Sequence, residues 1–324
     1  MDLTLNSDQI ALRDGIRDYL AGRWDASRLR DAASGVAPIS AADWKELAGL
    51  GVFGLIHPAE LGLGLADAAI VFEELGAALV PGPLVPTLLA AGTVAGAAAG
   101  DTIVTALDSA AGPAVVESPR FAGAVISLDG NGVFLRPMAE VPVTLVEAPL
   151  DPLTPVGVVT AGLAPGEQVG SAADATAWRL RGTVLTAALQ VGVARGALDL
   201  GVRYVQEREQ FGRVVGSFQA VKHLLAESLV RVELARAAVL AAAVTVDDPA
   251  VGDPQVAAAT AKVLADDAAT AGGRTCIQVH GGMGFTWEIL AHLYLKRAWV
   301  HETAFGSPAD HEAFLAAQLP GPGV

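Results

Sequence analysis

Cysteine, basic residues and long apolar runs are all scarce in this chain, and each shortage excludes a class of protein. The single cysteine, Cys276, leaves no internal disulfide within 324 residues and fits a reducing compartment. Lys and Arg number 21 against 35 Asp and Glu, and the formal net charge of −14 argues against a nucleic-acid partner or an anionic membrane surface. The apolar run at 84–100 is short and rich in Ala and Gly, so we expect a core helix there and no membrane span.

Signals for export, metal binding and hydrolysis are also missing. The opening Met-Asp-Leu-Thr is acidic, which predicts no secretory signal and a cytoplasmic location. The histidines lack metal-ligand spacing, and His301-Glu302 is not followed by the second histidine of a zinc helix, so no metal site is predicted. No Gly-x-Ser-x-Gly motif of a hydrolase occurs. Hydrophobic residues, at 52%, are in contrast abundant enough for a large core.

Helical patterns dominate both ends of the chain. Apolar spacing predicts helices over 8–21, from Ser40 to about Gly51, over 66–79 and over 84–100. Four long helices follow in the last part, over 185–206, 218–246, 254–279 and 287–305, and would form a bundle. Asp253 and Pro254 are a typical cap and first residue for the third of these.

Short β-branched runs separate the two helical parts. The segments 124–128 and 133–136 flank Asp-Gly-Asn-Gly, which predicts a β-hairpin, and 141–147 predicts another strand. The fold class is therefore mainly α with a small β domain. We expect an N-terminal helical domain at 1–100, a reduced middle β domain at 101–177 and a C-terminal four-helix bundle at 178–324.

Two short motifs carry the functional signal. Arg-Glu-Gln-Phe-Gly at 208–212 supplies a guanidinium whose donors fit a pyrophosphate and a phenylalanine that can cover a ring. Gln-Val-His-Gly-Gly-Met-Gly-Phe at 278–285 interrupts two predicted helices with glycines, which exposes backbone amides to an anion. Each motif also has a plain explanation: a salt bridge of Arg208 with Glu207, and an ordinary turn at the glycines.

In this order, with helical sequence between them, the motifs resemble the C-terminal half of the acyl-CoA dehydrogenase family. Segments 5–13, 47–55 and 73–76 resemble the family's earlier helices, whereas 81–177 does not match. The resemblance implies an FAD site at a seam between subunits. One protomer would hold the pyrophosphate and adenine side with Arg208 and Phe211, beside Phe218 and Gln219 in the same groove. The neighbouring chain would meet the ADP portion with Gln278, Gly281 and Gly282.

The family's catalytic base is absent from both of its usual positions. The family's Tyr-Glu-Gly-Thr segment falls on Phe305-Gly306-Ser307, so phenylalanine replaces the glutamate and Ser307 remains as a cofactor-binding candidate. The alternative base position falls on Gly182. Glu302, about one helical turn before Phe305, is the fallback for a displaced base.

The middle region also lacks the family's Thr-Glu-Pro, Gly-Ser-Asp and Trp-x-x-Gly segments. The resemblance thus implies the shortened, non-catalytic member of a heteromeric acyl-CoA dehydrogenase, a class known from steroid-degrading bacteria. A full-length acyl-CoA dehydrogenase subunit would supply the base in an α2β2 heterotetramer, with an acyl-CoA substrate and an electron-transfer flavoprotein as acceptor. Two alternatives stay open: an autonomous homotetrameric dehydrogenase using Glu302, and a scaffold whose flavin motifs are relics.

Overall fold

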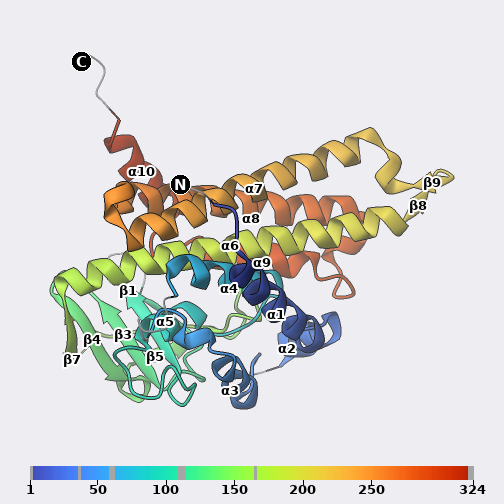
Figure 1. Cartoon of the computed structure of the whole chain (residues 1–324). Coiled ribbons are helices and arrows are strands. Elements are labelled where there is room, and N and C mark those ends of the chain that lie inside the picture. The colour runs from blue at the N-terminus through green and yellow to red at the C-terminus, as the bar shows by residue number, and fades with distance from the viewer. Residues whose placement is uncertain (1–2, 36–37, 58–62, 109–113, 164–165, 320–324) are drawn as a thin grey trace.

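Helices form most of the protein, and a small β region lies against them near one end (Figure 1). The computed structural model describes residues 3–35, 38–57, 63–108, 114–163 and 166–319. The helices of the first part are α1 (Ser7–Arg23), α2 (Ala26–Ser34), α3 (Ala41–Gly49), α4 (Leu65–Ala77) and α5 (Leu84–Ala90), with a 3-10 turn at Val52–Gly54. This mainly helical architecture with a small β region confirms the predicted fold class.

Side-chain caps fix the starts of the first helices. Asn6 accepts hydrogen bonds from the amides of Asp8 and Gln9, and Ser40 caps α3 as the sequence predicts. The prediction of a helix over 84–100 is wrong in its length, because α5 ends at Ala90 and turns follow. Gly96 and Gly100 adopt φ of 79° and 69°, conformations that glycine alone enters without strain and that a helix cannot contain.

Seven strands of the β region form two sheets. One sheet has the order β1-β3-β4-β7 and the other β2-β6-β5. The strands are β1 (Val104–Asp108), β2 (Val115–Glu117), β3 (Ala124–Leu128), β4 (Gly132–Pro137), β5 (Val143–Leu145), β6 (Val156–Val159) and β7 (Glu167–Ser171). Only β1 and β3 pair in parallel among these described strands.

The predicted hairpin is confirmed as β3–β4. Leu128 pairs with Val133, and the Asp129 carboxylate accepts hydrogen bonds from the amides of Asn131 (2.7 Å) and Gly132 (3.1 Å). The strand predicted over 141–147 is shorter, because only 143–145 pair with β6.

Five helices make up the last part: α6 (Ala172–Glu207), α7 (Gln219–Asp247), α8 (Pro254–His280), α9 (Ala291–His301) and α10 (Pro308–Ala317). Figure 1 shows α6, α7 and α8 running side by side, with the short hairpin of β8 (Glu209–Gln210) and β9 (Arg213–Val214) at one end. Asp253 caps α8 and Pro254 is its first residue, as predicted. Helix α6 begins well before the predicted residue 185, because Ser171 and Asp174 form a capping box at its start.

One apolar core joins the N-terminal helices, the first sheet and the bundle. Helices α4 and α6 approach so closely that a Cβ on Gly76 would lie 2.1 Å from the Leu189 carbonyl oxygen. A Cβ on Gly192 would likewise lie 2.0 Å from the Glu73 carbonyl oxygen. Helix α6 is long and apolar enough to cross a membrane by composition, but 83% of its most apolar stretch is buried inside the protein, as in the core helix of a globular fold.

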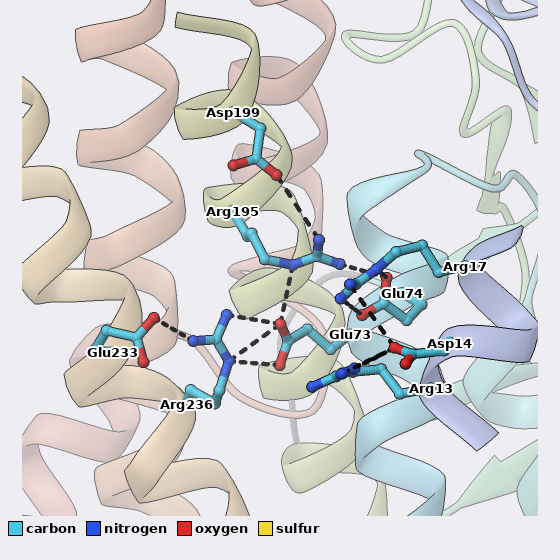
Figure 2. Close-up of polar contacts among 9 residues, drawn as sticks. All are labelled: Arg13, Asp14, Arg17, Glu73, Glu74, Arg195, Asp199, Glu233 and Arg236. Atoms are coloured by element: carbon cyan, nitrogen blue, oxygen red, sulfur yellow. Dashed lines mark hydrogen bonds and ion pairs between the residues drawn. The ribbon is translucent and has the colours of Figure 1, made fainter. Parts of the chain in front are cut away.

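Adjacent carboxylates on α4 bind arginines from three other helices (Figure 2). Glu73 accepts hydrogen bonds from Arg195 on α6 (3.0 Å) and Arg236 on α7 (2.8 Å). Glu74, only 3% exposed, pairs with Arg195 (2.6 Å) and with Arg17 on α1 (2.8 Å). These bonds fix α1 and α4 against the bundle.

Candidate functional site

The Arg-Glu-Gln-Phe-Gly motif forms an exposed hairpin at one end of the bundle. Arg208 ends α6, and its amide donates to the Tyr204 carbonyl oxygen (2.9 Å). The Arg208 side chain is exposed and has no hydrogen bond or ion pair with the residues that the structure describes. Phe211 has the left-handed φ of 54° and is 91% exposed. A free guanidinium and a presented aromatic ring therefore lie close in sequence on one hairpin, as a phosphate and ring system would require.

Phe218 and Gln219 follow the same hairpin. The Phe218 ring lies edge-on to Phe211, with 6.3 Å between ring centroids, and the Arg213 guanidinium covers it at 4.0 Å. Gln219 is the exposed first residue of α7. Of the four residues predicted here, Phe211 and Phe218 are thus in ring contact, and Arg208 and Gln219 are exposed next to them in the sequence.

The glycine motif ends α8 and opens a shallow groove. Gly281 has φ of 60°, and a Cβ on Gly281 or Gly282 would meet nothing within 4 Å. The groove has a volume of about 450 Å³ and is lined in part by Arg274, Gln278, Gly281, Gly282, Phe285 and Trp299. Open backbone beside an arginine and a glutamine fits the polar part of a dinucleotide.

Tyr204 connects the two motifs within the chain. Its ring stacks on His280 with centroids 4.2 Å apart, and its hydroxyl donates to the Met283 sulfur at 3.9 Å. His280 Nδ1 donates to the Cys276 carbonyl oxygen (2.7 Å), so Nε2 carries the lone pair. Burial lowers the pKa of His280 and keeps its ring neutral.

Cys276 is a buried structural residue. Burial raises the pKa of its thiol to about 12, which leaves almost no thiolate at neutral pH. Among the described residues, no group of three His, Cys, Asp or Glu side chains could hold a metal ion.

The two family positions for a base, Gly182 and Phe305, pack directly against each other. A Cβ on Gly182 would lie 2.4 Å from Phe305 Cε1, so the ring fills the space that any side chain at 182 would need. Phe305 has the left-handed φ of 55°, and its carbonyl oxygen contacts His311 Nε2 (3.1 Å) and the Thr183 hydroxyl (3.4 Å). This place holds an aromatic ring and no carboxylate.

Ser307 and Glu302 are engaged in local structure. Ser307 caps α10: its hydroxyl donates to the Asp310 carboxylate (2.6 Å) and accepts from the Asp310 amide (3.3 Å). The Glu302 carboxylate accepts a hydrogen bond from Thr270 on α8 (3.4 Å), and its carbonyl oxygen accepts one from buried Lys262 (3.0 Å). Glu302 therefore points into the bundle.

A larger cavity of about 570 Å³ lies beside Phe305, between the β region and the bundle. Its polar wall includes Thr105, Glu117 and His301, none of which the sequence predicts to be a catalytic or cofactor-binding residue. Glu117 is only partly exposed to solvent, and its burial among protein atoms raises the pKa of its carboxyl to about 7. Burial, together with the charges of Arg297 and Lys262, holds the pKa of His301 well below its usual value. Nothing in the local run Val-Val-Glu at 115–117 marks Glu117 as unusual.

Comparison with known proteins identifies the family. The family model described as "Acyl-CoA dehydrogenase, C-terminal domain" matches residues 180–319, and "Acyl-CoA dehydrogenase, N-terminal domain" matches 6–99. Acyl-CoA dehydrogenase IpdE2 of Mycobacterium tuberculosis is 33% identical across 95% of this chain and 96% of that protein. The chain belongs to the acyl-CoA dehydrogenase family, which confirms the resemblance noted in the motifs.

Acyl-CoA dehydrogenase FadE34 of Mycobacterium tuberculosis is 35% identical over 92% of this chain, which spans about half (46%) of FadE34. The solved Tcur3481-Tcur3483 steroid ACAD variant is 25% identical, with a TM-score of 0.85 over 97% of this chain and 98% of that one. The ChsE4-ChsE5 complex of Mycobacterium tuberculosis (24% identical, TM-score 0.83, 99% and 100% covered) has the same fold. So does a glutaryl-CoA dehydrogenase of Mycobacterium smegmatis solved with FADH2 (16% identical, TM-score 0.80, 99% and 96% covered).

Proposed function

We propose that this chain is the shortened, non-catalytic subunit of a heteromeric FAD-dependent acyl-CoA dehydrogenase that introduces an α,β double bond into an acyl-CoA thioester. The observation that carries this proposal is the contact between Gly182 and Phe305, which fills both family base positions without a carboxylate. A full-length partner subunit supplies the catalytic glutamate. The similarity to IpdE2 across nearly the whole of both chains supports a role at this shortened length.

The reaction needs a base for the proton next to the thioester and an acceptor for the hydride of the adjacent carbon. FAD, when bound, supplies the hydride acceptor. The residues of this chain hold the cofactor. Arg208 binds the pyrophosphate, because its exposed guanidinium has no partner among the described residues and can donate two parallel hydrogen bonds.

Ring contacts and backbone amides complete this binding role. Phe211 covers the adenine side from the hairpin, beside Phe218 and Gln219. From the other protomer, Gln278 and the open backbone at Gly281 and Gly282 approach the ADP portion. Arg274, which lines the same groove, adds positive charge toward the phosphates.

The names of two similar structures support a proposal for the assembly and the substrate. Two similar structures carry paired names, ChsE4-ChsE5 and Tcur3481-Tcur3483, and the second is described as a steroid ACAD. We therefore propose an α2β2 heterotetramer acting in the cytoplasm on a steroid side-chain acyl-CoA, with an electron-transfer flavoprotein as the acceptor.

The test is co-expression with candidate full-length acyl-CoA dehydrogenase subunits from the same genome, followed by flavin absorbance and dehydrogenase activity of the chain alone and of the complex. We expect both signals only in the complex. Arg208→Gln should weaken FAD binding by the complex about tenfold or more, because a hydrogen bond to a charged group contributes about 1.5–3 kcal/mol. The control is Arg120→Gln, a second exposed arginine far from either motif in sequence, which should leave FAD binding unchanged.

Two results would contradict the proposal, and each favours a different alternative. Turnover by the isolated chain that is lost in Glu302→Gln would indicate an autonomous dehydrogenase with a displaced base. Full FAD content in a complex carrying both Arg208→Gln and Gln278→Ala would indicate a scaffold with relic motifs.

A further inference from the structure

Arg136 on β4 is a buried arginine without a counter-ion. The residue is only 8% exposed, and its Nη2 donates a hydrogen bond to the neutral Ser127 hydroxyl (3.1 Å). Its Nε and Nη1 have no hydrogen-bond partner, and it forms no ion pair, among the residues that the structure describes. Burial of an unpaired charge is costly, so buried charges in proteins are paired as a rule. The unpaired guanidinium of Arg136 therefore indicates a missing anionic partner.

Arg136 lines a groove in the β region. The groove has a volume of about 530 Å³ and lies where the turns after α5 meet the start of β3, the end of β4 and the segment that leads into β7. This volume is in the usual range for small-molecule sites. No residue of the two flavin motifs lines the groove, so the proposed flavin-binding role does not use it.

The other walls of the groove define the chemistry of the partner. Small and apolar residues provide much of the lining: Val94, Ala95, Ala124, Leu135 and Pro137. They favour an apolar body on the ligand. Two exposed glutamates, Glu140 and Glu167, also line the groove and disfavour a second negative charge on the ligand. A carboxylate is the planar anion that matches the donors of a guanidinium.

We propose that this groove binds a monocarboxylate with a small apolar body, whose carboxylate pairs with Arg136. The site belongs to this chain alone. It requires neither flavin nor a partner subunit, so its test is independent of the proposed function.

Glu140 and Glu167 are the internal alternative to a ligand, because either carboxylate could pair with Arg136. Both side chains are exposed, and neither forms an ion pair with Arg136 in the structure. Moving either carboxylate to a buried guanidinium would remove its hydration. The two explanations predict opposite effects of Arg136→Met on stability. The unpaired charge predicts a higher urea midpoint for the variant, whereas an internal ion pair predicts a lower one.

The experiment is calorimetric titration of the isolated full chain with three probes: hexanoate, 1-hexanol and inorganic phosphate. We expect saturable one-site binding of hexanoate, at least tenfold tighter than that of 1-hexanol or phosphate, because only hexanoate has both the charge and the apolar body. Arg136→Met should bind hexanoate no better than 1-hexanol, and hexanoate should no longer raise its urea midpoint. Arg136→Lys keeps the charge without the planar fork and should show an intermediate affinity.

Arg120→Met, at an exposed arginine outside the groove, is the matched control and should behave as the wild type. The double variant Glu140→Gln with Glu167→Gln removes the repelling charges, so it should bind hexanoate more tightly than the wild type. Absence of saturable hexanoate binding would overturn the proposal, as would wild-type affinity in a folded Arg136→Met variant. A lowered urea midpoint in both Arg136→Met and the double glutamate variant would also overturn it, because the chain would then supply its own counter-ion.

Discussion

The contact between Gly182 and Phe305 predicts that alanine at 182 has opposite effects in two backgrounds. A Cβ at this position would lie 2.4 Å from Phe305 Cε1, well inside the ordinary carbon contact distance of about 3.5–4.0 Å. Overpacking of this kind destabilises the fold by about 1–3 kcal/mol, whereas replacing a helix-interior glycine by alanine stabilises it by about 0.5–1 kcal/mol. We therefore expect Gly182→Ala to lower the free energy of unfolding by about 1–2 kcal/mol.

Removing the Phe305 ring should reverse the sign of the effect of Gly182→Ala on stability. In a Phe305→Ala background the clash is gone, so Gly182→Ala should stabilise by about 0.5–1 kcal/mol, which gives a coupling energy of about 2 kcal/mol. Urea unfolding followed by circular dichroism, extrapolated linearly to water, measures all four corners of the cycle.

The control for this cycle is Gly15 on α1, where a Cβ would meet nothing within 4 Å. Gly15→Ala should stabilise both backgrounds equally, because only helix propensity changes there. An equal cost of Gly182→Ala with and without the Phe305 ring would refute the contact, and with it the observation behind the proposed function.

Three further predictions concern charged groups. Glu73→Gln removes the carboxylate that two arginines share, so we expect a loss of about 3 kcal/mol, seen as a lower urea midpoint with an unchanged helical spectrum. Asp266→Asn leaves the fully buried Lys262 ammonium without its carboxylate and should cost about 3–5 kcal/mol, whereas Lys262→Met combined with Asp266→Leu should restore most of it; a destabilised double variant would contradict this reasoning. The pKa of Glu117 is about 7 in the folded state against the ordinary 4.5, so between these pH values the folded state binds a proton that the unfolded state has lost. Relative to high pH, protonation of Glu117 therefore stabilises the fold by about 3 kcal/mol below about pH 4.5, and this stabilisation is lost as pH rises to 7. A stability difference between wild type and Glu117→Gln that does not change with pH would refute this prediction.

Local signals in the sequence are sufficient for most of the elements. The caps Ser40 and Asp253 and the turn after Leu128 lie where local chemistry predicts them, because side chain and backbone interact within a few residues. The start of α6 was missed because Ser171 and Asp174 form its capping box inside a segment that otherwise resembles a loop. The length of α5 was overestimated because an alanine-rich pattern hides glycines that need positive φ.

In the candidate site, too, contiguous motifs could be predicted from the sequence, whereas contacts between distant residues could not. Arg208, Phe211 and the glycines of the second motif could be named from sequence because each motif is short and contiguous. The packing of Gly182 on Phe305 could not, because it joins residues far apart in the chain and depends on how α6 meets the end of the bundle. Glu117 could not be predicted either, because an ordinary strand residue lines a cavity only once the distant segments of the fold have come together.

The carboxylates of α4 also constrain how the protein is made. Glu73 leaves the ribosome long before both of its cations, Arg195 and Arg236, whereas Glu74 is made after Arg17 of α1 and waits only for Arg195. Until α6 is synthesised, the nascent α4 also lacks the backbone surface against which Gly76 packs. The first helices therefore cannot complete their packing and ion pairs early in translation. They reach their final contacts only after residue 236 has emerged.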